Sequence, residues 1–202
     1  ESVPLLQVLF QSEEGLCRLT GFCFDGDSIE GETFEGLEGK ECLFRNCTFC
    51  GSRFPAAYFA NVRFQHCDFS NADFSKSTFS RVEWQNCKMT GTNLTEASLS
   101  DVTMENCRCD YLNLSFSRLK DGVFTDTDFR QASFNDCVLH AFGFDDCLLR
   151  RAEFLHTPLK GMDLTTCEID GISLAGPELR GAIVTPLQAV ELSRLLGIVI
   201  KE

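Results

Sequence analysis

The sequence of 202 residues lacks the features that mark several common classes of protein. It contains no run of about 18 apolar residues, which a transmembrane helix would need. The first residues, ESVPLLQ, show no basic stretch followed by an apolar one, so we predict no secretory signal and expect a cytoplasmic protein. Basic residues are also few: 18 lysines and arginines face 30 aspartates and glutamates, a formal net charge of -12. We therefore expect neither a membrane nor a nucleic acid as a direct partner.

Phenylalanine and cysteine are in excess, with 19 and 12 residues. From Leu19 to Val184 every fifth residue is apolar except Gly39, and 15 of the 19 phenylalanines fall in this slot, the central position. The residue two places earlier is mostly small or apolar, and the other three slots are mostly polar. Residues two apart in extended backbone point the same way, so we expect both restricted slots to face inward. Neither a helical period nor a plain strand fits, and the chain must coil around its apolar slots.

The cysteines add a longer period. Six of them lie at spacings that are multiples of twenty residues, namely Cys47, Cys67, Cys87, Cys107, Cys147 and Cys167. Twenty residues are four units of five, so we interpret one coil as a four-sided turn with small thiols stacked along one face.

These units resemble a known family. The pattern of a small residue, Asp or Asn, Leu or Phe, Ser, Thr or Arg, and a polar residue, as in ADFSK from Ala72 to Lys76, is similar to that of the pentapeptide-repeat family. The resemblance implies an all-β fold, a right-handed quadrilateral parallel β-helix that forms a solenoid. We expect an N-terminal cap or irregular segment over residues 1–16, the β-helix over 17–184, and a C-terminal helix and tail over 185–202.

The C-terminal segment predicts a short helix, because Thr185 is suited to the N-cap, Pro186 to the first helical position and Gly197 to the end. Its apolar content exceeds what one coil end can cover. The helix and tail also resemble the dimerising C-terminus of the Qnr-type, or quinolone-resistance, branch of the family. We therefore expect a homodimer through this region, with a capped monomer as the alternative. The expected interface residues are Leu192, Leu195, Leu196, Ile198, Val199 and Ile200.

The first coils are less regular. Asp27 and Glu32 fall in the small slot, where an unpaired buried carboxylate would be costly. We expect these coils either to fray or to be covered by residues 5–10. Gly39, together with Leu37, suggests a local distortion of the second coil.

We find no sequence motif that predicts a catalytic, metal-binding or cofactor-binding site. Cys47 and Cys50 match a CxxC motif, but the repeat places one inward and the other outward, so we predict neither a redox nor a zinc site. His66, His140 and His156 fall on three different faces. No glycine-rich phosphate loop or paired-carboxylate cleft occurs. We predict no enzyme, no catalytic residues, no metal and no cofactor.

The uneven charge is the remaining indication of function. Sorted by face, the expected partner-binding acids are Glu83, Glu105, Asp126, Asp145, Asp146 and Asp163. About eight and a half coils at about 4.8 Å make a rod of about 40 Å with a strong negative charge. The Qnr-type resemblance implies a DNA-mimicking rod that binds a type II topoisomerase, DNA gyrase or topoisomerase IV, and protects it from quinolones. The alternative is a non-catalytic interaction scaffold with another partner. We expect no projecting loops, because no insertion breaks the repeat between Phe44 and Val184.

Overall fold

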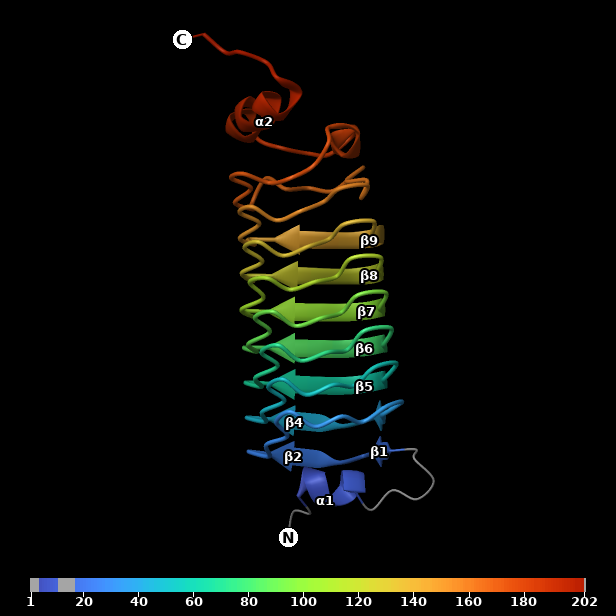
Figure 1. The fold of residues 1–202 in the computed structure, drawn as a ribbon. Coiled ribbons are helices and arrows are strands. Elements are labelled where there is room, and N and C mark those ends of the chain that lie inside the picture. The colour runs from blue at the N-terminus through green and yellow to red at the C-terminus, as the bar shows by residue number, and fades with distance from the viewer. Residues whose placement is uncertain (1–3, 11–16, 202) are drawn as a thin grey trace.

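In the computed structural model, which describes residues 4–10 and 17–201, the chain winds into a parallel β-solenoid whose coils stack along one axis (Figure 1). The predicted fold class is confirmed. The strands of its nine-stranded sheet are β1 (Arg18–Thr20), β2 (Cys23–Asp25), β3 (Glu38–Lys40), β4 (Leu43–Arg45), β5 (Tyr58–Gln65), β6 (Thr78–Gln85), β7 (Ser98–Glu105), β8 (Arg118–Thr125) and β9 (Val138–Asp145).

The register between coils is twenty residues throughout. Phe59 pairs with Phe79 between β5 and β6, and parallel bridges continue at the same spacing up to Asp163 and Ile183. Gly39 pairs regularly with Phe59, so the expected distortion of the second coil is absent there. With the register unbroken, the faces of the solenoid are smooth ladders without inserted loops.

The central positions form the core. They are buried almost without exception, and phenylalanines one coil apart stack on one another, with ring centroids 4.9 Å apart for Phe49 and Phe69 and 4.8 Å for Phe134 and Phe154. Each such side chain contributes about 1.5–3 kcal/mol through burial. This repeated stacking explains the phenylalanine excess.

Side chains alternate every two residues in extended backbone, whereas the inward-facing residues of this chain recur every five. The corners between units make the two periods compatible. Two residues after most central positions the backbone adopts a left-handed conformation, for example φ 51° at Asn46 and 47° at Asp126. Asn, Asp and Gly tolerate this conformation best. The turn reverses the alternation, so the next small and central residues again point inward.

The N-terminal end is closed by α1 (Leu5–Phe10), which lies against the first coil (Figure 1). Leu5 and Leu9 are buried in the core. The Leu5 amide donates a hydrogen bond of 2.9 Å to the Asp27 carboxylate, so this acid in a small slot has a partner. Glu32 is exposed and avoids the cost of burial. The predicted boundary at residue 16 lies outside the described residues, as does Glu202.

The C-terminal end consists of η2 (Pro177–Leu179), α2 (Pro186–Ser193) and η3 (Arg194–Leu196). Thr185 caps α2, because its side chain accepts a hydrogen bond from the Gln188 amide while the Gln188 side chain accepts one from the Thr185 amide. The Gln188 Nε2 also donates to the backbone oxygens of Leu164 and Cys167 and so docks α2 on the last coil. No helix among the described residues is long and apolar enough to span a membrane.

Candidate functional site: an acidic patch on the solenoid

Four carboxylates gather along one edge of the solenoid, and we call Glu105, Asp126, Asp145 and Asp146 the acidic patch. Glu105 ends β7 and Asp145 ends β9, while Asp126 and Asp146 are the left-handed corner residues that follow β8 and β9. All four are exposed. None of them has an ion-pair partner within the described part of the chain.

The fold places these charges close together. Glu105, Thr125 and Asp145 pair in register on successive strands. Asp126 and Asp146 are one coil apart, which is about 4.8 Å along the axis. Unit charges this close repel by about 1 kcal/mol even in water. A cationic surface that docks on the patch removes this repulsion.

Two of the predicted acids lie apart from the patch. Glu83 forms an ion pair of 3.1 Å with Arg63, its neighbour one coil earlier, so part of its charge is neutralised. Asp163 accepts hydrogen bonds from the amide and hydroxyl of Thr165, which hold the pKa of Asp163 below its usual value. The predicted acidic face is therefore a cluster of four carboxylates with two outlying ones.

An open groove of about 920 Å³ runs along the patch. Glu105, Asp126 and Asp146 line it, and Lys88 and Arg108 lie on its other side. Its lining also includes Asp128.

Asp128 reaches the groove because a corner brings two faces together. Burial alone would raise the pKa of Asp128, but hydrogen bonds from the Arg130 side chain and backbone outweigh it and hold that pKa below its usual value. Asp128 therefore forms an ion pair with Arg130, whereas the four carboxylates of the acidic patch form none among the described residues.

The cysteines form no disulfide bond. All 12 are free. Cys47 is buried and Cys50 half-buried, in agreement with their predicted inward and outward slots. The described residues contain no group of three or more His, Cys, Asp or Glu side chains that could hold one metal ion. The nearly complete burial of Cys137 and Cys147 raises the pKa of their thiols to about 11 and about 12.

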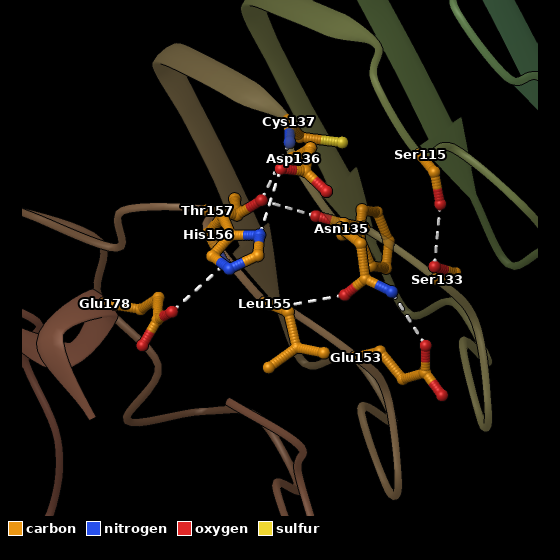
Figure 2. A network of polar contacts seen from close by, with 11 residues as sticks. Ser115, Ser133, Asn135, Asp136, Cys137, Glu153, Leu155, His156, Thr157 and Glu178 are labelled. Carbon is orange, nitrogen blue, oxygen red and sulfur yellow. Dashed lines mark hydrogen bonds and ion pairs between the residues drawn. The ribbon is translucent and has the colours of Figure 1, made fainter. Parts of the chain in front are cut away.

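The three histidines are exposed and separate, as the repeat predicts. Only His156 belongs to a larger polar network, shown in Figure 2. Its Nδ1 lies 3.0 Å from the Asp136 carboxylate, and its backbone amide donates a hydrogen bond of 3.0 Å to Glu178. This network joins the last coils to η2.

A second surface lies at the C-terminal end. Five of the six predicted interface residues are exposed, with Val199 84% and Leu196 60% accessible. Leu192 is the exception, because it is buried against the last coil of its own chain. The apolar surface instead continues through other exposed residues of the same end, namely Ile183, Leu187 and Val190.

Two exposed aromatic residues were not among the predicted site residues. Tyr111 and Phe116 occupy successive corners in the left-handed conformation, with φ 60° and 62°, and are 58% and 60% exposed. Bulky residues rarely adopt this conformation. The signal in the sequence was an aromatic residue in a slot usually held by Gly, Asn or Asp.

Comparison with known proteins gives a family and several solved structures. A sequence model described as "Pentapeptide repeat region" matches residues 37–114 and 77–154. No curated protein matches. A trypsin-treated variant of QnrB1, a plasmid-mediated fluoroquinolone resistance protein, is 23% identical over 91% of this chain and 97% of its own, with a TM-score of 0.49.

Two cyanobacterial proteins are more distant. HetL, a pentapeptide repeat protein involved in heterocyst differentiation regulation in Nostoc sp. strain PCC 7120, is 12% identical over 90% of this chain and 94% of its own, with a TM-score of 0.38. The pentapeptide repeat protein Rfr23 from Cyanothece 51142 is 13% identical over 90% of this chain and 99% of its own, with a TM-score of 0.26. At these values the solved structures support no argument about function.

Proposed function

Because the chain belongs to the pentapeptide-repeat family, whose members are generally structural or interaction proteins, we propose that it acts by binding a partner protein and not by catalysis. The solenoid is filled by its own core, and its outer faces are ladders of polar side chains. Such a surface offers extended contact area in place of an enclosed substrate pocket.

The proposed partner is a type II topoisomerase, DNA gyrase or topoisomerase IV, which the acidic rod binds in place of DNA. The observation that carries this proposal is the acidic patch, four unpaired carboxylates on one edge of a rod with a net charge of -12. A basic surface that normally contacts DNA phosphates is complementary to such a rod.

The negative sign of the rod's charge supports mimicry of DNA, and the magnitude of the charge supports it in part. A rod of about 40 Å corresponds to B-DNA with about 24 phosphate charges, at one charge per about 1.7 Å. The chain's net charge of -12 is about half of that value.

A homodimer through the exposed C-terminal surface is part of the same proposal. Two rods joined end to end would extend about 80 Å and present two acidic patches. The apolar residues at this end and the resemblance of residues 185–202 to the Qnr-type terminus support it. A cytoplasmic location is part of the same proposal.

A supercoiling assay with purified DNA gyrase tests the proposal. We expect the protein to inhibit supercoiling at micromolar concentrations and to restore activity in the presence of a quinolone. Inhibition without relief from the drug would support binding and reject protection. Absence of both effects on gyrase and on topoisomerase IV would reject the proposed partner.

The second candidate is an interaction scaffold with a different partner, favoured by Tyr111 and Phe116. These aromatic side chains project from corners away from the acidic patch, and DNA mimicry gives them no role. This candidate predicts unchanged quinolone susceptibility in a host that overexpresses the protein.

A further inference from the structure

Two stacked cysteines belong to the wall of the groove beside the acidic patch. Cys87 and Cys107 line it together with Glu105, Asp126 and Asp146. The two cysteines are otherwise buried, with 2% and 4% of their surface exposed. A pair of buried thiols, for which the proposed partner binding has no use, thus lies behind a groove lined by four carboxylates and by Lys88 and Arg108.

The two thiols have the same geometry in successive coils. The Cys87 thiol donates to the backbone oxygen of Gln85 at 3.4 Å, and the Cys107 thiol donates to that of Glu105 at 3.3 Å. Gln85 and Glu105 are partners in the register of β6 and β7. Because equivalent residues hold both side chains, the sulfur atoms are separated by about the strand spacing, about 4.8 Å.

This separation suits a metal ion with two ligands. Thiolate sulfur is the ligand that soft cations such as Cu⁺ select. Metal–sulfur bonds of about 2.3 Å put two sulfurs about 4.6 Å apart when the ion lies midway between them. Ions that need three or four protein ligands find no such group among the described residues. The stack therefore selects an ion that takes two sulfurs in a line.

We propose that Cys87 and Cys107 form a two-sulfur site for a soft cation with linear coordination, of the class of Hg²⁺ and Cu⁺, which enters through the acidic groove. On binding, two S–H bonds break, two metal–sulfur bonds form, and two protons pass to water. With a divalent ion the product has no net charge, so no unpaired charge is buried. The groove carries four carboxylates against Lys88 and Arg108, and this net negative charge raises the local concentration of the cation.

This site differs from the one that the sequence analysis rejected. The CxxC cysteines, Cys47 and Cys50, are three residues apart in one coil and lie in inward and outward slots. Cys87 and Cys107 are twenty residues apart and share one slot in neighbouring coils.

The test uses the folded protein with Hg²⁺ as probe, in a background in which the more accessible Cys23 and Cys50 are replaced by serine. Bound ions are counted by native mass spectrometry, and released protons are measured at constant pH. We expect Cys87→Ala combined with Cys107→Ala to bind one ion fewer and release two protons fewer. Alanine already occupies the same slot at Ala72 and Ala97, so the variant should fold.

Cys137→Ala is the matched control. Cys137 is equally buried, but its neighbours one coil away, Ser117 and Thr157, carry no sulfur. We expect this variant to keep the full number of ions. The proposal is overturned if the double variant binds as many ions as its background, or if uptake occurs only with loss of the β-sheet circular dichroism signal.

The entry route has its own test. Combined Glu105→Gln, Asp126→Asn and Asp146→Asn should slow uptake by about tenfold, because the groove no longer attracts the cation, and leave the number of bound ions unchanged. An unchanged rate would overturn the route through the groove.

Discussion

Gly39 and Phe59 lie against each other in neighbouring coils, and the phenyl ring fills the space that a side chain on Gly39 would need. The two residues pair in register between β3 and β5. A Cβ atom on Gly39 would lie 2.7 Å from Cδ1 and 2.8 Å from Cε1 of the ring. The one central position without an apolar side chain is thus filled from the next coil.

Gly39→Ala should therefore destabilise the protein. The added methyl group must displace a buried ring, and overpacking of this kind costs about 1–3 kcal/mol in the free energy of unfolding. Denaturant-induced unfolding measures this loss. The control is Gly143→Ala in β9, since a Cβ at Gly143 meets nothing within 4 Å. We expect a change of no more than about 0.5 kcal/mol there, and an equal loss at both positions would contradict the explanation.

The fold was predictable because every unit of five repeats the same physical requirement. The central and small slots revealed the coil, and the spacing of twenty between cysteines revealed its register. Gly39 could not be interpreted in this way, because its space is filled by a residue twenty positions later in the chain. The predicted distortion at Gly39 was wrong for the same reason, because the ring of Phe59, one coil later, fills the space that the missing side chain leaves.

The candidate site was only partly predictable. Sorting charges by face ignored ion-pair partners in neighbouring coils. Arg63 and Glu83 are twenty residues apart, and the register makes them an ion pair that the sorting missed. Leu192 was assigned to the dimer surface because α2 was considered alone, whereas docking by Gln188 turns Leu192 toward the last coil.

Neutralisation of the acidic patch should weaken topoisomerase inhibition. Asp126→Asn, Asp145→Asn and Asp146→Asn remove three unpaired charges while asparagine retains the left-handed corners. We expect the concentration for half-inhibition to rise at least about tenfold, with a weaker dependence on salt, because fewer charge contacts form. Supercoiling assays at two salt concentrations provide the measurement.

A matched variant distinguishes the effect of charge at the acidic patch from the effect of the total net charge. Glu35→Gln, Glu96→Gln and Asp101→Asn also remove three exposed charges, from other parts of the surface. We expect it to inhibit almost as well as the unmodified protein. If both triple variants lose inhibition equally, net charge and not the acidic patch determines binding.

Substitutions in the exposed C-terminal surface should abolish dimerisation and leave the folding of the monomer unchanged. Leu196→Glu with Val199→Glu places charges on two largely exposed residues, so the midpoint of thermal unfolding of the monomer should hardly change. Sedimentation should then show a monomer for this variant and the proposed dimer for the unmodified protein. A dimer that persists in this variant would reject the proposed interface.

Leu192→Ala should have the opposite profile. Because Leu192 packs in the core, its truncation should cost about 2–4 kcal/mol of folding free energy. The protein that remains folded should still dimerise. Loss of the dimer without loss of stability would show that Leu192 belongs to the interface, as the sequence analysis expected.

We predict that protonation of the Glu178 carboxylate lowers the stability of the fold in acid. Its carboxylate accepts hydrogen bonds from the amides of His156 at 3.0 Å (Figure 2) and of Ala175 at 3.1 Å, which fasten η2 to the last coils. Burial alone would raise the pKa of Glu178, but these backbone hydrogen bonds outweigh it and hold the pKa below its usual value. A carboxyl group with a lower pKa in the folded state stabilises the fold above its unfolded pKa of about 4.3. That contribution disappears as the pH falls through the folded pKa.

Glu178→Gln should therefore lower the free energy of unfolding at pH 7 by about 1–2 kcal/mol, because a neutral amide accepts these hydrogen bonds less strongly. The difference from the unmodified protein should begin to shrink as the pH falls below about 4.3, where Glu178 of the unfolded chain becomes protonated, and should be smallest below the lower folded pKa. Urea unfolding at a series of pH values from 7 to 3 measures it. Glu96→Gln, at an exposed corner, should show little difference at any pH. A deficit in Glu178→Gln that stays constant down to pH 3 would mean that the shape of the side chain, and not its charge, holds η2 in place.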